Sequence, residues 1–329
     1  MSTPKSKAQP SAAAFLGGVL AAPAAEVAGP RVVLTAHMDE VGFLIHDITP
    51  DGFLRLVPIG GWPDGVLAAQ RLRVLARANG REFIGIVTAL PPHQGGTQAA
   101  SPDKVFVDLG VRSAQGVRAL GLREGDPVVP EAPFIPLAEA GLYAAKAFDN
   151  RAGMAALTLA IQRLDAQPPA CQALAVATVQ EEVGCRGAVV AARLAQPDVV
   201  IVLEGPPADD GPGFNRADCQ GRLGGGVQIR LYDPTAITNP RLARLAIDTA
   251  RAEGIPHQVT VRRSGGTDAG SFHQANSGIP SIVLGVPARY IHSHNAIIDI
   301  NDHLHLIALV TALVGKFDTH TVDSLTTYL

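Results

Sequence analysis

The stretch Ala173-Leu-Ala-Val-Ala-Thr-Val179 is a short apolar run, and the acidic pair Glu181-Glu182 follows it after a single glutamine. An apolar run of this length predicts a strand that is buried on both faces of a sheet. Two adjacent carboxylates at the end of a buried strand are costly unless something binds them. The stretch therefore predicts a covered sheet with a charged site at the end of one strand.

Strands and helices alternate through most of the chain. Residues 31–37 form an apolar run that ends at His37, and residues 198–203 form another that ends before Glu204. This alternation predicts an α/β fold, with a mainly parallel sheet flanked by helices on both faces. We expect helices at 150–164, 187–194, 240–253 and 302–317, and further strands at 257–262 and 280–286.

The segment from residue 51 to residue 137 has a different sequence pattern. Gly, Pro and Asn separate short β-like pieces, and Asn79-Gly80 is a good hairpin signal. The pattern predicts a small inserted β-barrel domain. We expect a disordered leader at 1–14, the α/β domain at 15–50 and 138–329, and the β-barrel domain at 51–137.

Composition excludes several classes of function. The 329 residues are 47% apolar and 17% charged, the net charge is -3, and no dense run of lysine and arginine occurs. Nucleic acid and anionic membranes are therefore not expected as partners. Three cysteines without a Cys-x-x-Cys spacing do not support a disulfide framework or a zinc ribbon. Of these, Cys185 is expected to be a small buried thiol rather than a nucleophile.

The N-terminus allows two interpretations. Lys5 and Lys7 precede an alanine-rich apolar stretch, so residues 1–25 resemble a secretory signal. The interpretation that we adopt is a leader that runs into a first strand near residues 15–20 of a cytoplasmic protein. No apolar run reaches about 18 residues, so no membrane span is expected.

Potential metal ligands recur at the ends of expected strands and in the adjoining loops. Side chains in this position are His37, Asp149, Glu181, Glu182, Glu204 and His292. In a parallel sheet the carboxyl ends of the strands meet at one crevice. A two-metal hydrolase needs histidine and carboxylate ligands and one further carboxylate that acts as the base. These side chains provide that set.

Five motifs carry a family resemblance. In chain order they are Ala36-His-Met-Asp-Glu-Val-Gly-Phe43, Ala147-Phe-Asp-Asn-Arg151, Val179-Gln-Glu-Glu-Val-Gly184, Gly265-Gly-Thr-Asp-Ala-Gly270 and Pro287-Ala-Arg-Tyr-Ile-His292. This set resembles the M42 metallo-aminopeptidases, the glutamyl and tetrahedral aminopeptidase group of the di-zinc peptidase clan. The similarity runs from about residue 15 to the C-terminus. Five motifs in order form a highly specific signal, although any one alone is weak.

The resemblance implies two divalent metal ions per subunit, zinc first and cobalt or manganese as alternatives. His37 would bind one ion and His292 the other, and Asp149 would bridge them. Glu182 and Glu204 would be terminal carboxylate ligands, one on each ion.

The resemblance also implies the remaining site residues. Glu181 would be the general base. Asp39 lies two residues from His37, so in an extended chain both face one way, and Asp39 would accept a hydrogen bond from the imidazole. The candidates for substrate binding are Gly266, Thr267, Asp268, Arg289 and His294.

By resemblance, the chain is expected to remove N-terminal residues from short peptides. A homo-oligomer between a dimer and a dodecamer is implied, in which the inserted domain supports assembly and access. The chain departs from the family pattern in a short segment before His37, in glutamate at 204 where many members have aspartate, and in Ser293-His294-Asn295. The first departure means either a lost segment or an upstream start, and His294 is either an extra ligand or a pocket residue.

Two other functions stay open. A metal-independent glycoside hydrolase also uses paired carboxylates, but aromatic residues are only 5% of the chain, with one tryptophan for a sugar platform. A non-catalytic assembly protein is the other alternative. Glu181 argues against it, because a binding scaffold has no use for a base.

Overall fold

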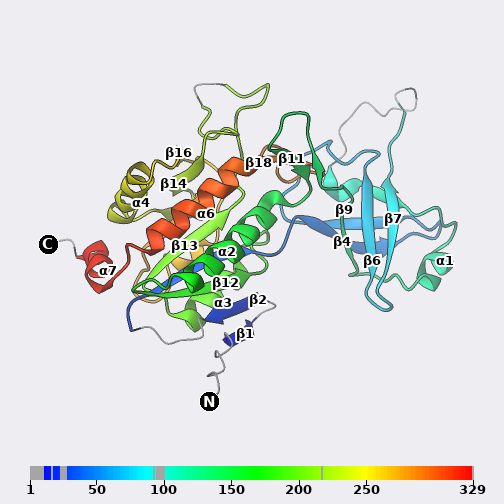
Figure 1. Ribbon diagram of the computed structural model, residues 1–329. Coiled ribbons are helices and arrows are strands. Elements are labelled where there is room, and N and C mark those ends of the chain that lie inside the picture. The colour runs from blue at the N-terminus through cyan, green and yellow to red at the C-terminus, as the bar shows by residue number, and fades with distance from the viewer. Residues whose placement is uncertain are drawn as a thin grey trace, which may run out of the picture. The chain divides into compact units, whose positions relative to one another are not determined.

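The computed structural model describes residues 11–15, 18–22, 28–91, 93, 101–215 and 218–327. These residues fold into two units (Figure 1). The first, here called the sheet unit, contains the described residues up to Asp39, Phe148–Arg289, and those from Ile298 onward. The second, the barrel unit, contains the described residues of Glu40–Ala147 and Tyr290–Ile297.

In the described ranges, the sheet unit is built on a nine-stranded sheet in the order β1-β2-β12-β3-β13-β17-β14-β15, with β16 paired to β14. Its strands are β1 (Ser11–Phe15), β2 (Gly18–Ala22), β3 (Arg31–His37), β12 (Gln172–Thr178), β13 (Val199–Glu204), β14 (Val227–Asp233), β15 (Ala236–Ile237), β16 (His257–Val261) and β17 (Ser281–Gly285). The central strands β12, β3, β13 and β17 are parallel. Every residue of β13 is buried, as expected for a strand covered on both faces.

Helices cover both faces of this sheet. They are α2 (Phe148–Ala166), α3 (Arg186–Ala195), α4 (Pro240–Ala252), α5 (Ala269–Phe272), α6 (Ile300–Val314) and α7 (Thr319–Thr326). Val200 and Val202 form one apolar cluster with Phe272 and the alanines of α3. Side chains alternate between faces along a strand, so Ile201 points to the opposite face, where α2 contacts β3 and β13 and packs against α6. Of the helices in the described ranges, none combines the length and hydropathy that a membrane crossing requires.

The barrel unit is a closed barrel in the order β4-β5-β8-β7-β6-β9. Its strands are β4 (Gly42–Ile48), β5 (Leu54–Ile59), β6 (Arg71–Ala76), β7 (Arg81–Val87), β8 (Phe106–Asp108) and β9 (Pro127–Pro130). Leu54, Leu72 and Val107 are fully buried in its interior. The remaining elements are a 3-10 turn (Pro102–Lys104), α1 (Ala114–Ala119), β10 (Ile135–Pro136), β11 (Leu142–Ala145) and β18 (Ala296–Asp299), which leads into α6.

The α/β fold with an inserted β-barrel is confirmed. The barrel unit begins at Glu40 rather than at residue 51, because β4 pairs with β5 and β9 inside the barrel. It extends to Ala147, beyond the expected end at residue 137. The Asn79-Gly80 turn lies where expected, between the antiparallel strands β6 and β7.

Part of the expected leader is a strand. β1 pairs antiparallel with β2, and β2 adds to the edge of the sheet at β12. The alanine-rich sequence of β1 has weak β propensity, which is why no strand was predicted there. The first ten residues lie outside the described ranges, so the expectation of a leader and its secretory alternative fall largely on residues that the structure does not describe.

The burial of β13 predicts the effect of a truncation in the sheet core. Ile201 is fully buried, and Ile201→Ala should lower the free energy of unfolding by about 2–5 kcal/mol because a cavity remains. Urea unfolding followed by circular dichroism measures this change. The control Leu194→Ala, at a side chain that is 57% exposed, should change stability by less than about 0.5 kcal/mol. Equal losses in both variants would contradict the placement of β13 in the core.

Candidate active site

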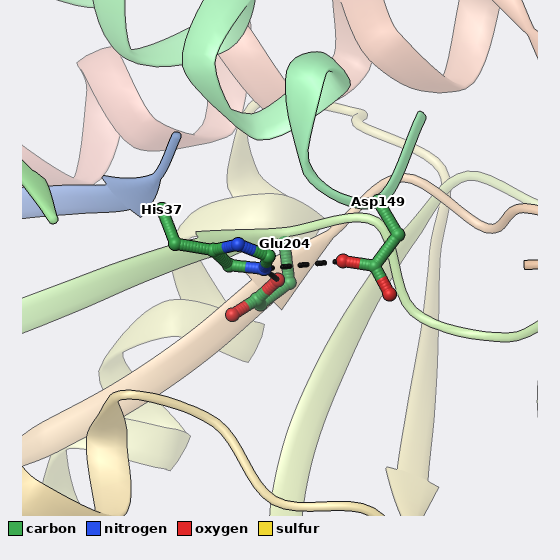
Figure 2. A group of neighbouring side chains, drawn as sticks. All are labelled: His37, Asp149 and Glu204. Carbon is green, nitrogen blue, oxygen red and sulfur yellow. Dashed lines mark hydrogen bonds and ion pairs between the residues drawn. The ribbon is translucent and has the colours of Figure 1, made fainter. Parts of the chain in front are cut away.

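The parallel register places the candidate site at the carboxyl edge of the sheet. His37 is the last residue of β3 and pairs in register with Thr178, the last residue of β12. Glu204 is the last residue of β13, the neighbour of β3 on its other side. Because these strands are parallel, His37, Glu204 and the turn after Thr178 lie at one edge of the sheet. Figure 2 shows His37 and Glu204 at this edge.

Asp149 reaches the same edge from the start of α2, where its own backbone is not helical. The next residue, Asn150, is fully buried and donates through its side-chain amide to the carbonyl of Leu203, at 2.8 Å. The Asn150 side chain also accepts from the amide of Gly153, at 3.0 Å. These two hydrogen bonds anchor the beginning of α2 to the end of β13, next to Glu204.

Three carboxylates converge on one imidazole nitrogen. Nε2 of His37 lies 3.1 Å from Oδ1 of Asp149 and 3.5 Å from Oε2 of Glu204 (Figure 2). It also lies 3.9 Å from Oε2 of Glu181. A neutral imidazole nitrogen can donate only one hydrogen bond, so it cannot satisfy all three. The arrangement is suited to a cation placed among these atoms.

Among the described residues of the sheet unit, two overlapping groups of donor atoms have a geometry that could hold a metal ion. His37, Asp149 and Glu204 form one group, and His37, Glu181 and Glu182 form the other, with donor atoms within 4.8 Å of one another in each. The buried Oε1 of Glu204 has no hydrogen-bond partner in the described part of the chain. A buried, unpartnered carboxylate oxygen is expensive, and a metal ion would satisfy it.

Asp39 contacts both His37 and the carboxylate pair. Nδ1 of His37 donates to the backbone carbonyl of Asp39 at 3.1 Å, while the Asp39 carboxylate is 3.6 Å away. That carboxylate accepts from the backbone amides of Glu181 and Glu182, at 3.3 and 3.2 Å. In the neutral imidazole the first contact keeps the proton on Nδ1, so Nε2 is the nitrogen that can bind a ligand. The second holds the turn that carries both glutamates.

The turn after β12 is rigidly held. The carbonyl of Glu181 accepts from the amides of Gly184 and Cys185, both at 2.9 Å. Cys185 adopts a left-handed backbone, with φ of 52°. A Cβ at Gly187 would lie 2.4 Å from the carbonyl oxygen of Val179, so only glycine fits at the start of α3. Backbone hydrogen bonds and close packing therefore position the two carboxylates.

Burial and mutual repulsion shift the pKa values of the ionisable side chains in the site. Burial raises the pKa of Glu181 to about 9, and the neighbouring carboxylates add to the rise although His37 opposes it. Burial likewise raises the pKa of Glu204. Burial alone would lower the pKa of His37, but the charge of Glu204 and hydrogen bonds to Asp149 and Asp39 raise it well above its usual value. The cluster carries excess negative charge, which a divalent cation would offset.

Two of the predicted substrate-binding residues lie beneath this site. Thr267 and Asp268 are buried, and Asp268 accepts a hydrogen bond from the hydroxyl of Thr178 at 2.5 Å. Gly266, beside them, is exposed. Sequence reasoning missed Thr178, although it is the only hydroxyl in its apolar run.

Arg289, His292 and His294 are the remaining predicted residues. Arg289 forms a two-pronged ion pair with Asp210, at 2.6 and 2.7 Å, and nothing local in the sequence predicts this partner. His292 and His294 belong to the barrel unit. There, His292 donates to the carbonyl of Gly61 at 2.6 Å, and buried His294 lies tilted against Trp62 with ring centres 6.1 Å apart. The sheet unit alone thus assembles His37, Asp149, Glu181, Glu182 and Glu204.

Comparison with known proteins identifies the family. A model of the M42 glutamyl aminopeptidase family matches residues 17–309. The chain belongs to the M42 aminopeptidase family. Members of this family are metallopeptidases, so the protein is a hydrolase that acts on peptides, and the histidine and carboxylate groups described above are its candidate metal ligands.

Individual M42 relatives agree with this assignment. The glutamyl aminopeptidase of Lactococcus lactis subsp. cremoris is 35% identical over 319 residues, which cover 95% of this chain and 88% of the relative. The TET aminopeptidase of Thaumarchaeota archaeon SCGC AB-539-E09 superposes with a TM-score of 0.90 at 35% identity, covering 94% and 88%. The TET1 peptidase of Pyrococcus horikoshii, which can assemble into a tetrahedron or a large octahedral shell, gives 0.82 at 28% identity, covering 95% and 91%.

Asp268 predicts a pH dependence of stability. Burial raises the pKa of Asp268 from 3.8 to about 7. At pH values between these two, the Asp268 carboxyl keeps its proton in the folded state but has lost it in the unfolded chain. Stability therefore falls as pH rises through this window. After chelation of metal, wild type should lose up to about 4 kcal/mol of unfolding free energy from pH 4 to 7.5 relative to Asp268→Asn. Urea unfolding at several pH values measures this difference, and a pH-independent difference would contradict the raised pKa.

Proposed function

We propose that this M42 member is a di-metal aminopeptidase that removes N-terminal residues from short peptides. The observation that carries the proposal is the convergence of Asp149, Glu181 and Glu204 on Nε2 of buried His37. A peptidase needs an activated water and a base beside it, and this cluster contains both a candidate metal site and a spare carboxylate.

The residues present fit two divalent ions. An imidazole and several carboxylates suit zinc, and also cobalt or manganese. Asp149 would be shared by the two ions. His37 and one glutamate of the pair Glu182 and Glu204 would hold one ion, and the other glutamate would hold the second. His292 is proposed as the remaining histidine ligand on the resemblance of its motif. Bound there, divalent ions would polarise the scissile carbonyl and acidify a water molecule.

Glu181 is the proposed general base. Its carboxylate oxygen takes a proton from the attacking water and passes it to the nitrogen of the leaving amine. Burial of Glu181 raises its pKa, whereas bound divalent cations would favour the carboxylate form that accepts the proton. Asp39 keeps Glu181 in place through the backbone of the turn.

We also propose that the chain forms a homo-oligomer in which the barrel unit supports assembly and access. The large assemblies formed by the TET1 peptidase of Pyrococcus horikoshii support this. A cytoplasmic location is proposed on the three cysteines, which stand as free thiols, because disulfides are rare in reducing compartments.

Replacement of the proposed base tests the mechanism. Glu181→Gln keeps the shape of the side chain but cannot accept a proton, so kcat on an aminoacyl-nitroanilide panel should fall about 10²–10⁴-fold. Bound metal, measured by elemental analysis, should be unchanged. The exposed Glu253 supplies the control Glu253→Gln, which should retain full activity. Wild-type rates in Glu181→Gln would exclude this residue as the base.

Metal content tests the cofactor. Wild-type protein should bind about two divalent ions per chain, and chelation should abolish activity until zinc, cobalt or manganese is restored. Glu204→Ala should bind at least one ion fewer, whereas Glu253→Ala should bind as wild type does. Activity that survives chelation, with fewer than about one tightly bound ion per chain, would contradict a metallopeptidase and favour the glycoside hydrolase alternative.

A further inference from the structure

The sheet unit contains a cavity of about 580 Å³ beside the proposed base. One wall is α3 and the opposite wall is the segment around α5. Lining residues that bear on its chemistry are Cys185, Val189, Arg193, Thr267, Ser271 and Gln274. None of these has a role in the metal cluster, and the sequence analysis singled out only Thr267 for substrate binding.

The near end of the cavity is lined by Cys185. Sγ of Cys185 is 3.7 Å from Oε1 of Glu181. The hydroxyl of Ser271 donates to the carbonyl of Cys185 at 3.3 Å, which joins the two walls at this end. The cavity therefore starts at a thiol that contacts the carboxylate which we assign as the base.

The cavity then follows one face of α3 away from Glu181. Cys185, Val189 and Arg193 are spaced four residues apart, so they line a single helix face. Eight residues of α-helix rise about 12 Å, and an extended peptide spans about 3.3–3.6 Å per residue. Long side chains on a helix lean toward its beginning, which shortens the span from Cys185 to the guanidinium of Arg193. The cavity thus has room for a fragment of two or three residues between the base and the guanidinium.

The cavity carries a positive charge at its far end. Arg193 is the only charged residue among those that line it. Within the described part of the chain, Arg193 has no ion-pair partner. Guanidinium groups bind carboxylates with two parallel hydrogen bonds and carry little hydration to lose. The far end of the cavity is therefore suited to a carboxylate.

The direction of proton transfer decides which part of a peptide enters. The base must reach the leaving amine nitrogen, so the part of the substrate that follows the scissile bond lies on the side of Glu181. We propose that the cavity binds this leaving fragment and that Arg193 pairs with a carboxylate on it. This inference rests on the proposed function. The carboxylate is supplied either by the C-terminus of a short peptide or by an acidic side chain near the cleaved bond.

Paired substrates test the inference in intact, metal-loaded protein. The first pair is Leu-Gly-Gly as the free acid and as the C-terminal amide, which isolates the main-chain carboxylate. The second pair is Leu-Glu-Gly-amide and Leu-Gln-Gly-amide, which isolates an acidic side chain. Leucine nitroanilide lacks both carboxylates and reports the hydrolytic reaction alone. Each substrate is assayed with wild type, Arg193→Gln, and the control Arg163→Gln, an exposed arginine on α2 outside the cavity.

Arg193→Gln should lower kcat/KM about ten-fold for at least one carboxylate substrate, mainly through KM, consistent with loss of one charge-assisted contact. Its rates on the amides without an acidic side chain and on the nitroanilide should stay within two-fold of wild type. The pair that responds identifies the source of the carboxylate. Equal effects on every substrate, or none on either pair, would overturn the inference. Absence of turnover on the nitroanilide by wild type would instead refute the proposed function.

Discussion

The concentration of buried negative charge at one edge of a parallel sheet is the constraint on which the rest of this structure depends. Asp149, Glu181 and Glu204 share a single histidine nitrogen, and in the described part of the chain the buried Oε1 of Glu204 has no hydrogen-bond donor. Such a cluster opposes folding unless a cation occupies it. The sheet tolerates it because the strands are held by their backbone pairing, while the side chains of Asp39 and Asn150 hold the turn after β12 and the start of α2.

Asp39 shows how closely the site and the scaffold are linked. Its carbonyl orients His37, and its carboxylate holds the amides of Glu181 and Glu182. One residue thus couples the end of β3 to the turn after β12. A spacing of two residues predicts a contact between the Asp39 carboxylate and the imidazole, because it indicates that both side chains face one way. The spacing does not reveal which oxygen of Asp39 makes the contact.

The central strands and the barrel could be predicted from the sequence because each is marked by a continuous or periodic apolar pattern. β14 was missed because glycines precede it and polar residues interrupt Val227–Asp233. The start of the barrel was misplaced because β4 reads as one more strand of the large sheet. The ion pair of Arg289 with Asp210 joins residues 79 apart, and no local pattern encodes such a contact. The metal-ligand candidates were recognised because their motifs are local, whereas the cavity along α3 depends on packing against α5.

The crowding at Gly187 has a consequence for anyone who wishes to redesign this molecule. Any larger residue there collides with the carbonyl of Val179. The turn between β12 and α3 would then have to move, and it would displace the side chains of Glu181 and Glu182. Mutant libraries that diversify the turn between β12 and α3 should consist mostly of inactive clones. Val189 and Arg193, on the outer face of the same helix, carry no such restriction. Substitutions at these two positions are better suited to altering the selectivity for substrates.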